Sequence, residues 1–200
     1  KMVPFAGFNM PVQYNNLIEE HMAVRNNVGV FDVSHMGEFR ISGNGALDLL
    51  QWVCSNDVSK LVDGKVLYSC LPNAEGGIVD DLLVYRMAEN DYFLVVNASN
   101  IEKDWNWIKS QNKFGAEMQN LSNNYSLLAV QGPKAIETLQ KLTSVNLSEI
   151  PYYNFTINTL ADIEEVIISN TGYTGAGGFE LYVKNNQAEK LWNEVLNAGK

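Results

Sequence analysis

Two adjacent carboxylates stand at the start of a run with the composition of a β-strand. Asp80 and Asp81 follow the pair Gly76-Gly77, and the aliphatic run that contains them ends at Tyr85. Paired glycines followed by β-branched and aliphatic residues predict a turn that leads into a strand. Since successive side chains of a strand point to opposite faces, the two carboxylates are expected on opposite faces.

A carboxylate on an apolar strand face requires a partner. Leaving it ionised without a cation or a hydrogen-bond donor costs several kcal/mol. For Asp80 two roles stay open, a cap of the Gly76-Gly77 turn or a partner elsewhere. For Asp81, which lies deeper in the run, a ligand is the more attractive partner.

Composition limits the class of protein. The 200 residues are 46% hydrophobic and 18% charged, which is ordinary for a globular protein of one large or two small domains. A net charge of -9 argues against nucleic acid or an anionic membrane as partner, because both require clustered Lys and Arg. The apolar stretches are strand-sized and too short to cross a bilayer.

The cysteines predict a reducing compartment, and the chain ends predict that the sequence is part of a longer protein. Cys54 and Cys70 are two in number and form no CxxC motif, so buried free thiols and a reducing compartment are expected. The sequence opens at Lys1 in mid-pattern and ends at Lys200 just after a predicted helix. We therefore expect a piece of a longer protein.

The N-terminal segment is expected to pack on the body of the protein. Residues 3–11 are apolar but contain two prolines, which predicts an irregular segment. From Asn16 the apolar positions recur at a helical spacing that includes His21. On such a stripe His21 is expected to be a hydrogen-bonded core histidine rather than a ligand.

From residue 28 the pattern of elements occurs twice, as two strands, a helix, three strands and a helix. Strands are predicted within 30–41, 66–71, 78–86, 92–97, 116–121, 126–131, 152–157, 163–169 and 178–183. Helices are predicted with inward residues Ala46, Leu49, Leu50 and Val53; Ile101, Trp105 and Ile108; Ile136, Leu139 and Leu142; and Ala188, Leu191, Trp192 and Val195. Pro133 is expected in the first turn of the third of these helices.

Residue identities support an internal repeat. Residues 41–51 align with 130–140, and residues 102–106 align with 189–193, in order and at nearly equal offsets. The sequence thus predicts an α+β protein made of two similar β2-α-β3-α halves, 28–114 and 115–199, with 1–27 packed on them. A crevice between halves is a favoured place for a ligand.

Five motifs together resemble one family. They are Phe31–Gly37, Gly76–Leu82, Val95–Ala98, Ala129–Pro133 and Thr171–Gly175 with Phe179-Glu180. In order and spacing they are similar to the T-protein (aminomethyltransferase) family of the glycine cleavage system, along the whole chain. The resemblance implies a duplicated folate-binding domain. It also implies a C-terminal barrel domain and a pocket arginine, which are expected to lie outside this chain.

The resemblance further implies an activity. Tetrahydrofolate would take the methylene from the aminomethyl group on the lipoyl arm of a carrier, the H-protein, with release of ammonia. The partners are then folate and the lipoylated H-protein, with neither nucleic acid nor membrane. The compartment would be the bacterial cytoplasm or the eukaryotic mitochondrion. This chain alone is expected to be inactive.

Residue roles also follow from the resemblance. Asp81 matches the catalytic aspartate, which would hold the folate nitrogen edge and stabilise a cationic methylene group. Glu180 matches the pterin-binding glutamate of the family. A carboxylate suits this role because it can accept two hydrogen bonds from the aminopyrimidinone edge. The remaining matched pocket residues are Met36, Tyr68, Asn97 and Tyr173. No metal ligand is expected, and His35 is expected to be structural.

The sequence departs from the family pattern at two places. Both lie in the loop around Tyr173 and leave Tyr173 and Glu180 themselves unchanged. Asn170 stands where the family has an arginine, and Ala176-Gly177 replaces two acids. Both changes put the electrostatics of the loop in question.

Two alternative functions remain. One is a non-catalytic folate-binding protein linked to iron–sulfur maintenance, but those proteins carry Lys-Gly-Cys-Tyr where this chain has Thr171–Thr174. The other is the folate-binding portion of a demethylating dehydrogenase, which only the flanking sequence can exclude.

Overall fold

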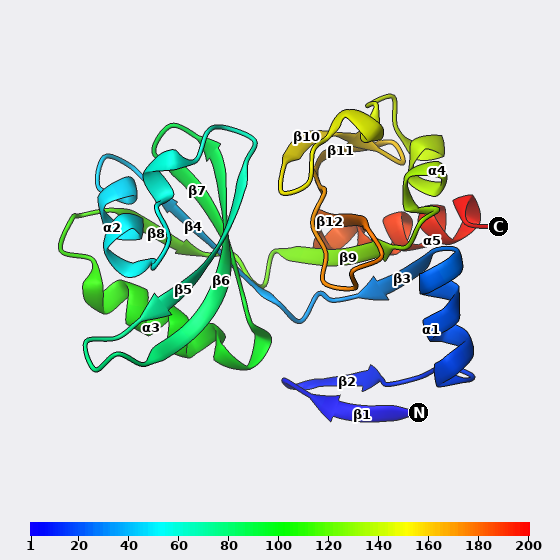
Figure 1. Cartoon of the computed structure of the whole chain (residues 1–200), viewed down its shortest axis with the longest axis horizontal. Coiled ribbons are helices and arrows are strands. Elements are labelled where there is room, and N and C mark those ends of the chain that lie inside the picture. Colours follow the sequence, from blue (N-terminus) through cyan, green and yellow to red (C-terminus); the bar gives the residue numbers. More distant parts are fainter. The chain divides into compact units, whose positions relative to one another are not determined.

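The computed structural model describes all residues, 1–200, and divides into two compact units (Figure 1). One unit comprises residues 1–35 and 125–200, and the other comprises residues 36–124. We call them the split unit and the central unit. Each contains a five-stranded antiparallel sheet with helices. The predicted α+β class is therefore confirmed.

The central unit has the strand order β5-β6-β7-β4-β8. Its strands are β4 (Gly37–Ser42), β5 (Val66–Pro72), β6 (Ile78–Ala88), β7 (Asp91–Val96) and β8 (Glu117–Asn120). Its helices are α2 (Ala46–Val53) and α3 (Ile101–Gln111), with 3-10 turns η1 (Val58–Lys60) and η2 (Ala98–Asn100). The predicted inward residues of α2 are all buried in the core, so that helical stripe is confirmed.

The split unit has the strand order β10-β11-β12-β9-β3. Its strands are β3 (Gly29–Asp32), β9 (Tyr125–Gln131), β10 (Phe155–Leu160), β11 (Ile163–Ser169) and β12 (Gly178–Lys184). Against this sheet pack α4 (Ala135–Leu139) and α5 (Ala188–Ala198). Further elements are α1 (Leu17–Asn26), η3 (Gln140–Leu142), η4 (Leu147–Glu149) and η5 (Asn185–Gln187).

The order of elements predicted from the repeat is confirmed, with an exchange of first strands. β3 opens the first repeat but pairs with β9, and β8 opens the second but pairs with β4. The compact units are consequently divided at residues 35/36 and 124/125. The halves 28–114 and 115–199 stay a division of the sequence, because each repeat lends one strand to the other sheet.

The aligned segments have the same local structure. Gly43 and Gly132 both have positive φ, of 85° and 132°, and each carbonyl accepts a hydrogen bond from the alanine that begins the next helix. Trp105 and Trp192 each occupy the fifth position of an 11-residue helix and pack against the core of their unit. The duplication argument predicts these tryptophans at equivalent buried positions; their positions in the helices are equivalent, but both side chains are half-buried.

The prediction of an irregular N-terminal segment is wrong. Residues 2–11 form a two-stranded hairpin, β1 (Met2–Phe5) and β2 (Phe8–Pro11), whose turn uses positive φ at Ala6 and Gly7. Both strands are edge strands, so a proline N atom can face solvent without removing a ladder hydrogen bond. This is why two prolines fit a strand here.

The expectation for His21 is also wrong. Helix α1 begins after its cap Asn16, whose side chain accepts from two backbone N–H groups. However, only Val24 of this helix is buried, and His21 is exposed. The helical period was correct, but the stripe does not face a core at His21.

Two elements of the split unit differ from the prediction. The strand expected within 152–157 is observed at 155–160, because Tyr153 has positive φ and a turn precedes the strand. Pro133 precedes α4, which begins only at Ala135, and Ile136 is 41% exposed instead of facing inward. Leu139 is buried as expected.

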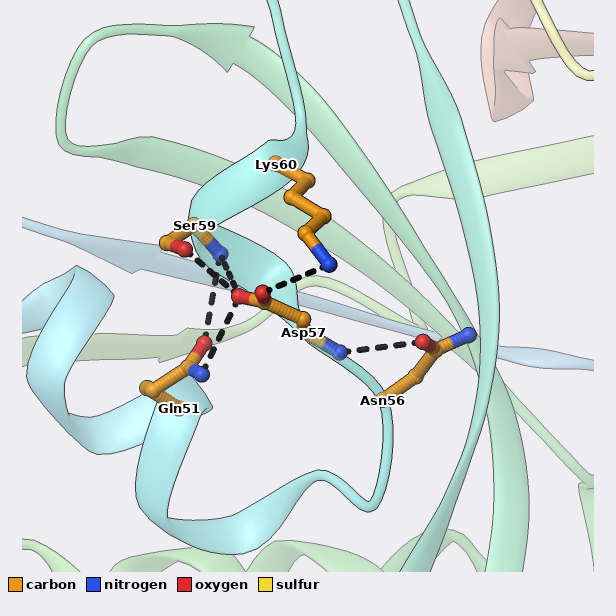
Figure 2. A network of polar contacts seen from close by, with 5 residues as sticks. All are labelled: Gln51, Asn56, Asp57, Ser59 and Lys60. Carbon is orange, nitrogen blue, oxygen red and sulfur yellow. Dashed lines mark hydrogen bonds and ion pairs between the residues drawn. The ribbon is translucent and has the colours of Figure 1, made fainter.

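A capped 3-10 turn follows α2 in the central unit. The Asp57 carboxylate accepts hydrogen bonds from the Ser59 N–H, the Ser59 hydroxyl and the Gln51 amide, and it pairs with Lys60 (Figure 2). The hydrogen bond from Ser59 lowers the pKa of Asp57, followed by the hydrogen bond from Lys60, and the Gln51 amide adds to the effect. This aspartate thus has a structural role.

Two further observations concern the cysteines and the length of the helices. Neither cysteine forms a disulfide: Cys54 is buried and Cys70 half-buried. None of the helices is long and apolar enough to span a bilayer.

Candidate functional site

The Asp81 carboxylate in β6 receives a hydrogen bond on each oxygen. The Tyr68 hydroxyl donates to Oδ2, and the Asn97 amide Nδ2 donates to Oδ1 at 2.6 Å. Tyr68 is paired with Leu83 in the β5–β6 ladder, which places it on the face of Asp81. Asn97 directly follows β7, so it comes opposite Asp81. Three residues predicted for the site are thus brought together.

The two carboxylates of β6 lie on opposite sides of the sheet, as predicted. Leu82 and Val84 are buried in the core with the helices, and Asp80 alternates with them on that side. Asp81 lies on the other side. Because donors hold both of its oxygens, the Asp81 carboxylate is a fixed anion that can stabilise a positive charge beside it.

A turn-capping role for Asp80 is excluded. The turn is capped by Asn73, whose Oδ1 accepts from the N–H groups of Glu75 and Gly77 at 3.1 and 2.8 Å. Asp80 instead lies inside β6 and accepts from the Asn97 and Asn100 amides at 3.0 and 2.9 Å. Of the two roles left open by the sequence, the partner elsewhere is the correct one.

Glu180 forms a second carboxylate site in β12 of the split unit. Its neighbours Phe179 and Leu181 are buried in the core, so Glu180 points to the face of the sheet away from α4 and α5. The Thr171 hydroxyl donates to Oε2. Burial raises the pKa of Glu180, and the hydrogen bond from Thr171 offsets part of this rise.

A glycine-rich loop borders a cavity next to this second site. The cavity has a volume of about 240 Å³ and is lined by Gln131, Tyr152, Thr171, Gly172, Gly175, Gly177 and Gly178. Gln131 fixes the loop, because its Nε2 donates to the carbonyls of Thr171 and Phe179, both at 3.2 Å. A Cβ on Gly172 would overlap the Gln131 side-chain amide, so this position excludes larger residues.

The residues that depart from the family pattern, Asn170 and Ala176-Gly177, contribute to the structure in and beside this loop. The Asn170 amide donates to the Ile150 carbonyl at 2.7 Å, which attaches the end of β11 to the preceding segment. Ala176 N–H donates to the Thr174 hydroxyl at 3.2 Å, and Gly177 has a φ of 75°. Asn170 therefore supplies a neutral hydrogen bond where the family pattern has a cation.

Two predicted residues are not joined to either carboxylate. Tyr173 is fully exposed on the loop, and Met36 is half-buried directly before β4. Their pocket roles stay predictions. His35 is half-buried with its ring edge-on to Phe5 at 5.3 Å, and burial lowers its pKa more than Asp32 raises it. This contact agrees with a structural His35.

The sequence interpretation missed four residues around the carboxylates. Asn100 and Asp104 lie near Asp80, and Gln131 and Thr171 lie near Glu180. Asp104 was detectable in principle, since it falls on the same helical stripe as Ile108 and a charge there is anomalous. Asn100 ends the 3-10 turn η2, Gln131 ends β9 and Thr171 lies in a loop, so no periodicity marks these three.

Comparison with known proteins gives the family. The sequence matches the GCVT N-terminal domain over residues 1–200. The chain belongs to this family. Curated relatives named aminomethyltransferase include those of Flavobacterium psychrophilum, 64% identical over the whole chain and 56% of the relative, and Bacteroides fragilis, 61% identical over the whole chain and 55% of the relative. The chain thus spans about half the length of the curated relatives it matches. The predicted resemblance is confirmed.

Solved structures agree with the GCVT assignment. The crystal structure of glycine cleavage system aminomethyltransferase T from Bartonella henselae is similar with a TM-score of 0.89 and 31% identity. The match covers 98% of this chain and 53% of that one. A heterotetrameric sarcosine oxidase from Corynebacterium sp. U-96 has a TM-score of 0.67 at 16% identity, over 90% of this chain and 89% of that one. That likeness shows a shared fold alone.

Proposed function

We propose that this GCVT chain serves a tetrahydrofolate-dependent aminomethyltransferase of glycine cleavage. The reaction moves a methylene group from the aminomethyl-dihydrolipoyl arm of the H-protein to tetrahydrofolate and releases ammonia. The observation that carries the proposal is the Asp81 carboxylate, held by the Tyr68 hydroxyl and the Asn97 amide. All three residues match pocket positions of the family, and they make hydrogen bonds to one another.

In this proposal Asp81 supplies the charge that the transfer requires. Positive charge develops on the carbon as it leaves the amine, and a preorganised anion lowers the free energy of that state. Tyr68 and Asn97 hold the carboxylate in one orientation, so little reorganisation is needed during the reaction.

The proposed role of Glu180 is to bind the folate. The aminopyrimidinone edge of a pterin presents adjacent N–H donors, and a carboxylate matches such a pair. Thr171 occupies one side of the Glu180 carboxylate and fixes its rotamer. Because burial raises the pKa of this group, a ligand that donates hydrogen bonds would gain by stabilising its charged form.

The partner and the compartment complete the proposal. The H-protein is the proposed donor, and tetrahydrofolate is the acceptor. The curated relatives are bacterial, so the cytoplasm is the proposed location. The same relatives favour this function over an iron–sulfur maintenance protein or a demethylating dehydrogenase, because they are named aminomethyltransferases at 50–64% identity.

The test is Asp81→Asn in the protein encoded by the complete open reading frame. We expect turnover to fall about 100-fold or more, while tetrahydrofolate binding stays within about tenfold, because the lost charge acts mainly in the transition state. The measurement is formation of 5,10-methylenetetrahydrofolate from aminomethylated H-protein.

Asp57→Asn is the matched control, since asparagine also caps a helical turn. It should leave both turnover and binding unchanged. Unchanged turnover in Asp81→Asn would instead reduce Asp81 to a structural residue.

A further inference from the structure

An unusual carboxyl group lies on the helix side of the central sheet. Asp104 of α3 is 0% exposed, and no N–H or O–H donor of the backbone or of a neutral side chain reaches either of its oxygens. The group that contacts it is the carboxyl of Asp80 in β6. Two carboxylates do not hold each other unless a proton lies between them.

The hydrogen bonds around Asp80 show which partner carries the proton. Asp80 Oδ1 accepts from the Asp81 N–H at 2.9 Å and from Asn97 Nδ2 at 3.0 Å, and Oδ2 accepts from Asn100 Nδ2 at 2.9 Å. All of these groups are donors, so they favour the charged form of Asp80. Asp104, which lacks such donors, is the member that is left to hold the proton.

The charges that face this pair agree with that assignment. Burial, followed by the hydrogen bond to Asp80 and the Asp80 charge, raises the pKa of Asp104 to about 8. Lys103 on the same helix lowers it and Asp81 on β6 raises it. For Asp80, burial raises the pKa, but the hydrogen bonds from Asp104, Asn100, Asp81 and Asn97 together lower it.

We propose that Asp104 is a positioning residue, a buried carboxylic acid whose O–H donates to Asp80 and thereby aligns Asn97 and Asp81. Asn97 Nδ2 is the link, because it lies between Asp80 Oδ1 and Asp81 Oδ1, at 3.0 and 2.6 Å. Loss of the proton from Asp104 places two adjacent anions beside each other. Asp80 then moves, and Asn97 Nδ2 loses one of its three acceptors, which are Asp80 Oδ1, Asp81 Oδ1 and the Asp81 carbonyl. The inference rests on the proposed function of Asp81.

The first experiment measures the proton directly in the wild-type chain. Side-chain carboxyl resonances of ¹³C-labelled aspartate are followed from pH 5 to pH 9.5, and Asp104→Asn assigns the Asp104 signal. We expect a midpoint near pH 8, as burial and Asp80 require. A midpoint below about pH 6 would overturn the proposal, because Asp104 would then be ionised at neutral pH.

The second experiment asks whether the proton matters for the reaction, in the protein encoded by the complete open reading frame. Asp104→Asn keeps a donor toward Asp80 at every pH, so it should retain kcat within about threefold and lose the alkaline fall in kcat centred near pH 8. Asp104→Leu removes the donor and should lower kcat about tenfold, with KM for tetrahydrofolate changed by less than about twofold.

The exposed residue Glu102 of the same helix gives the control, and Glu102→Gln should leave the pH profile unchanged. An Asp104→Asn profile identical to wild type would contradict the positioning role. Absence of aminomethyl transfer by the wild-type protein would defeat the proposed function instead, while the carboxyl titration would still decide the protonation of Asp104.

Discussion

The two units share one skeleton but differ in two buried positions. Asp104 is the fourth residue of α3, and the fourth residue of α5 is Leu191; both are 0% exposed. By the alignment of the repeats, Glu38 in β4 corresponds to Leu127 in β9, and these residues are 0% and 1% exposed. The central unit thus has acids at two positions where the split unit has leucine.

Packing alone does not require these acids. Leucine fills the corresponding positions in a fold of the same topology, and a buried acid costs stability relative to an apolar residue of similar volume. Neither oxygen of Glu38 has a hydrogen-bond partner, and burial raises its pKa to about 9. The presence of buried acids despite this loss of stability favours a functional role for polar groups in the central unit.

Leu191→Asp is the strongest test of this comparison. It places an acid in the hydrophobic core cluster of the split unit, so a carboxyl group is buried among apolar side chains. We expect the free energy of unfolding to fall by about 5 kcal/mol, measured by urea denaturation. Leu191→Met, which conserves volume, should cost less than about 1.5 kcal/mol. Equal stability of the Leu191→Asp and Leu191→Met variants would show that α5 tolerates an acid without a partner.

Glu38→Gln tests the second acid through pH. The folded-state pKa of Glu38 lies above its unfolded value, so its full stability contribution is present below about pH 4.5. That contribution is lost as pH rises toward about 9, because the unfolded chain releases a proton that the folded one keeps. Between pH 5 and pH 8 the wild type should lose about 4 kcal/mol relative to Glu38→Gln in urea titrations. Parallel pH profiles for the two proteins would show that Glu38 is not protonated in the folded state.

The tryptophans test what the units have in common. Trp105→Ala and Trp192→Ala each remove a half-buried ring from the fifth position of an equivalent helix, and each should cost about 2 kcal/mol. Thermal denaturation of the two variants should agree within about 1 kcal/mol. A cost confined to one of them would mean that the two helices do not pack alike.

Much of the fold could be predicted from the sequence, for a physical reason. The helices α2, α3 and α5 each bury one stripe, so the 3.6-residue period is visible in the sequence. The strand exchange could not be predicted, because β3 and β8 have the same local pattern whichever sheet they join. The N-terminal hairpin was missed because proline opposes a strand only where its missing N–H is needed.

The candidate site was predictable only in part. Asp81 and Asn97 lie in family motifs, and Tyr68 was matched to a pocket tyrosine of the family. Their mutual hydrogen bonds depend on strand register, which spacing does not specify. Asp104 is an anomalous acid on the stripe of Ile108, but that anomaly reveals neither its complete burial nor its interaction with Asp80. Thr171 lies within one of the family motifs, but its hydrogen bond to Glu180 joins residues nine apart across a loop.

The central claim is that these carboxylate sites serve a folate ligand, and calorimetry of tetrahydrofolate with this chain tests it most directly. We expect binding in the tens of micromolar or weaker, on the order of -6 kcal/mol. Glu180→Gln should weaken it about tenfold or more, and Asp57→Asn should leave it unchanged. Equal affinity of Glu180→Gln and wild type, or no binding by wild type at millimolar tetrahydrofolate, would contradict the account.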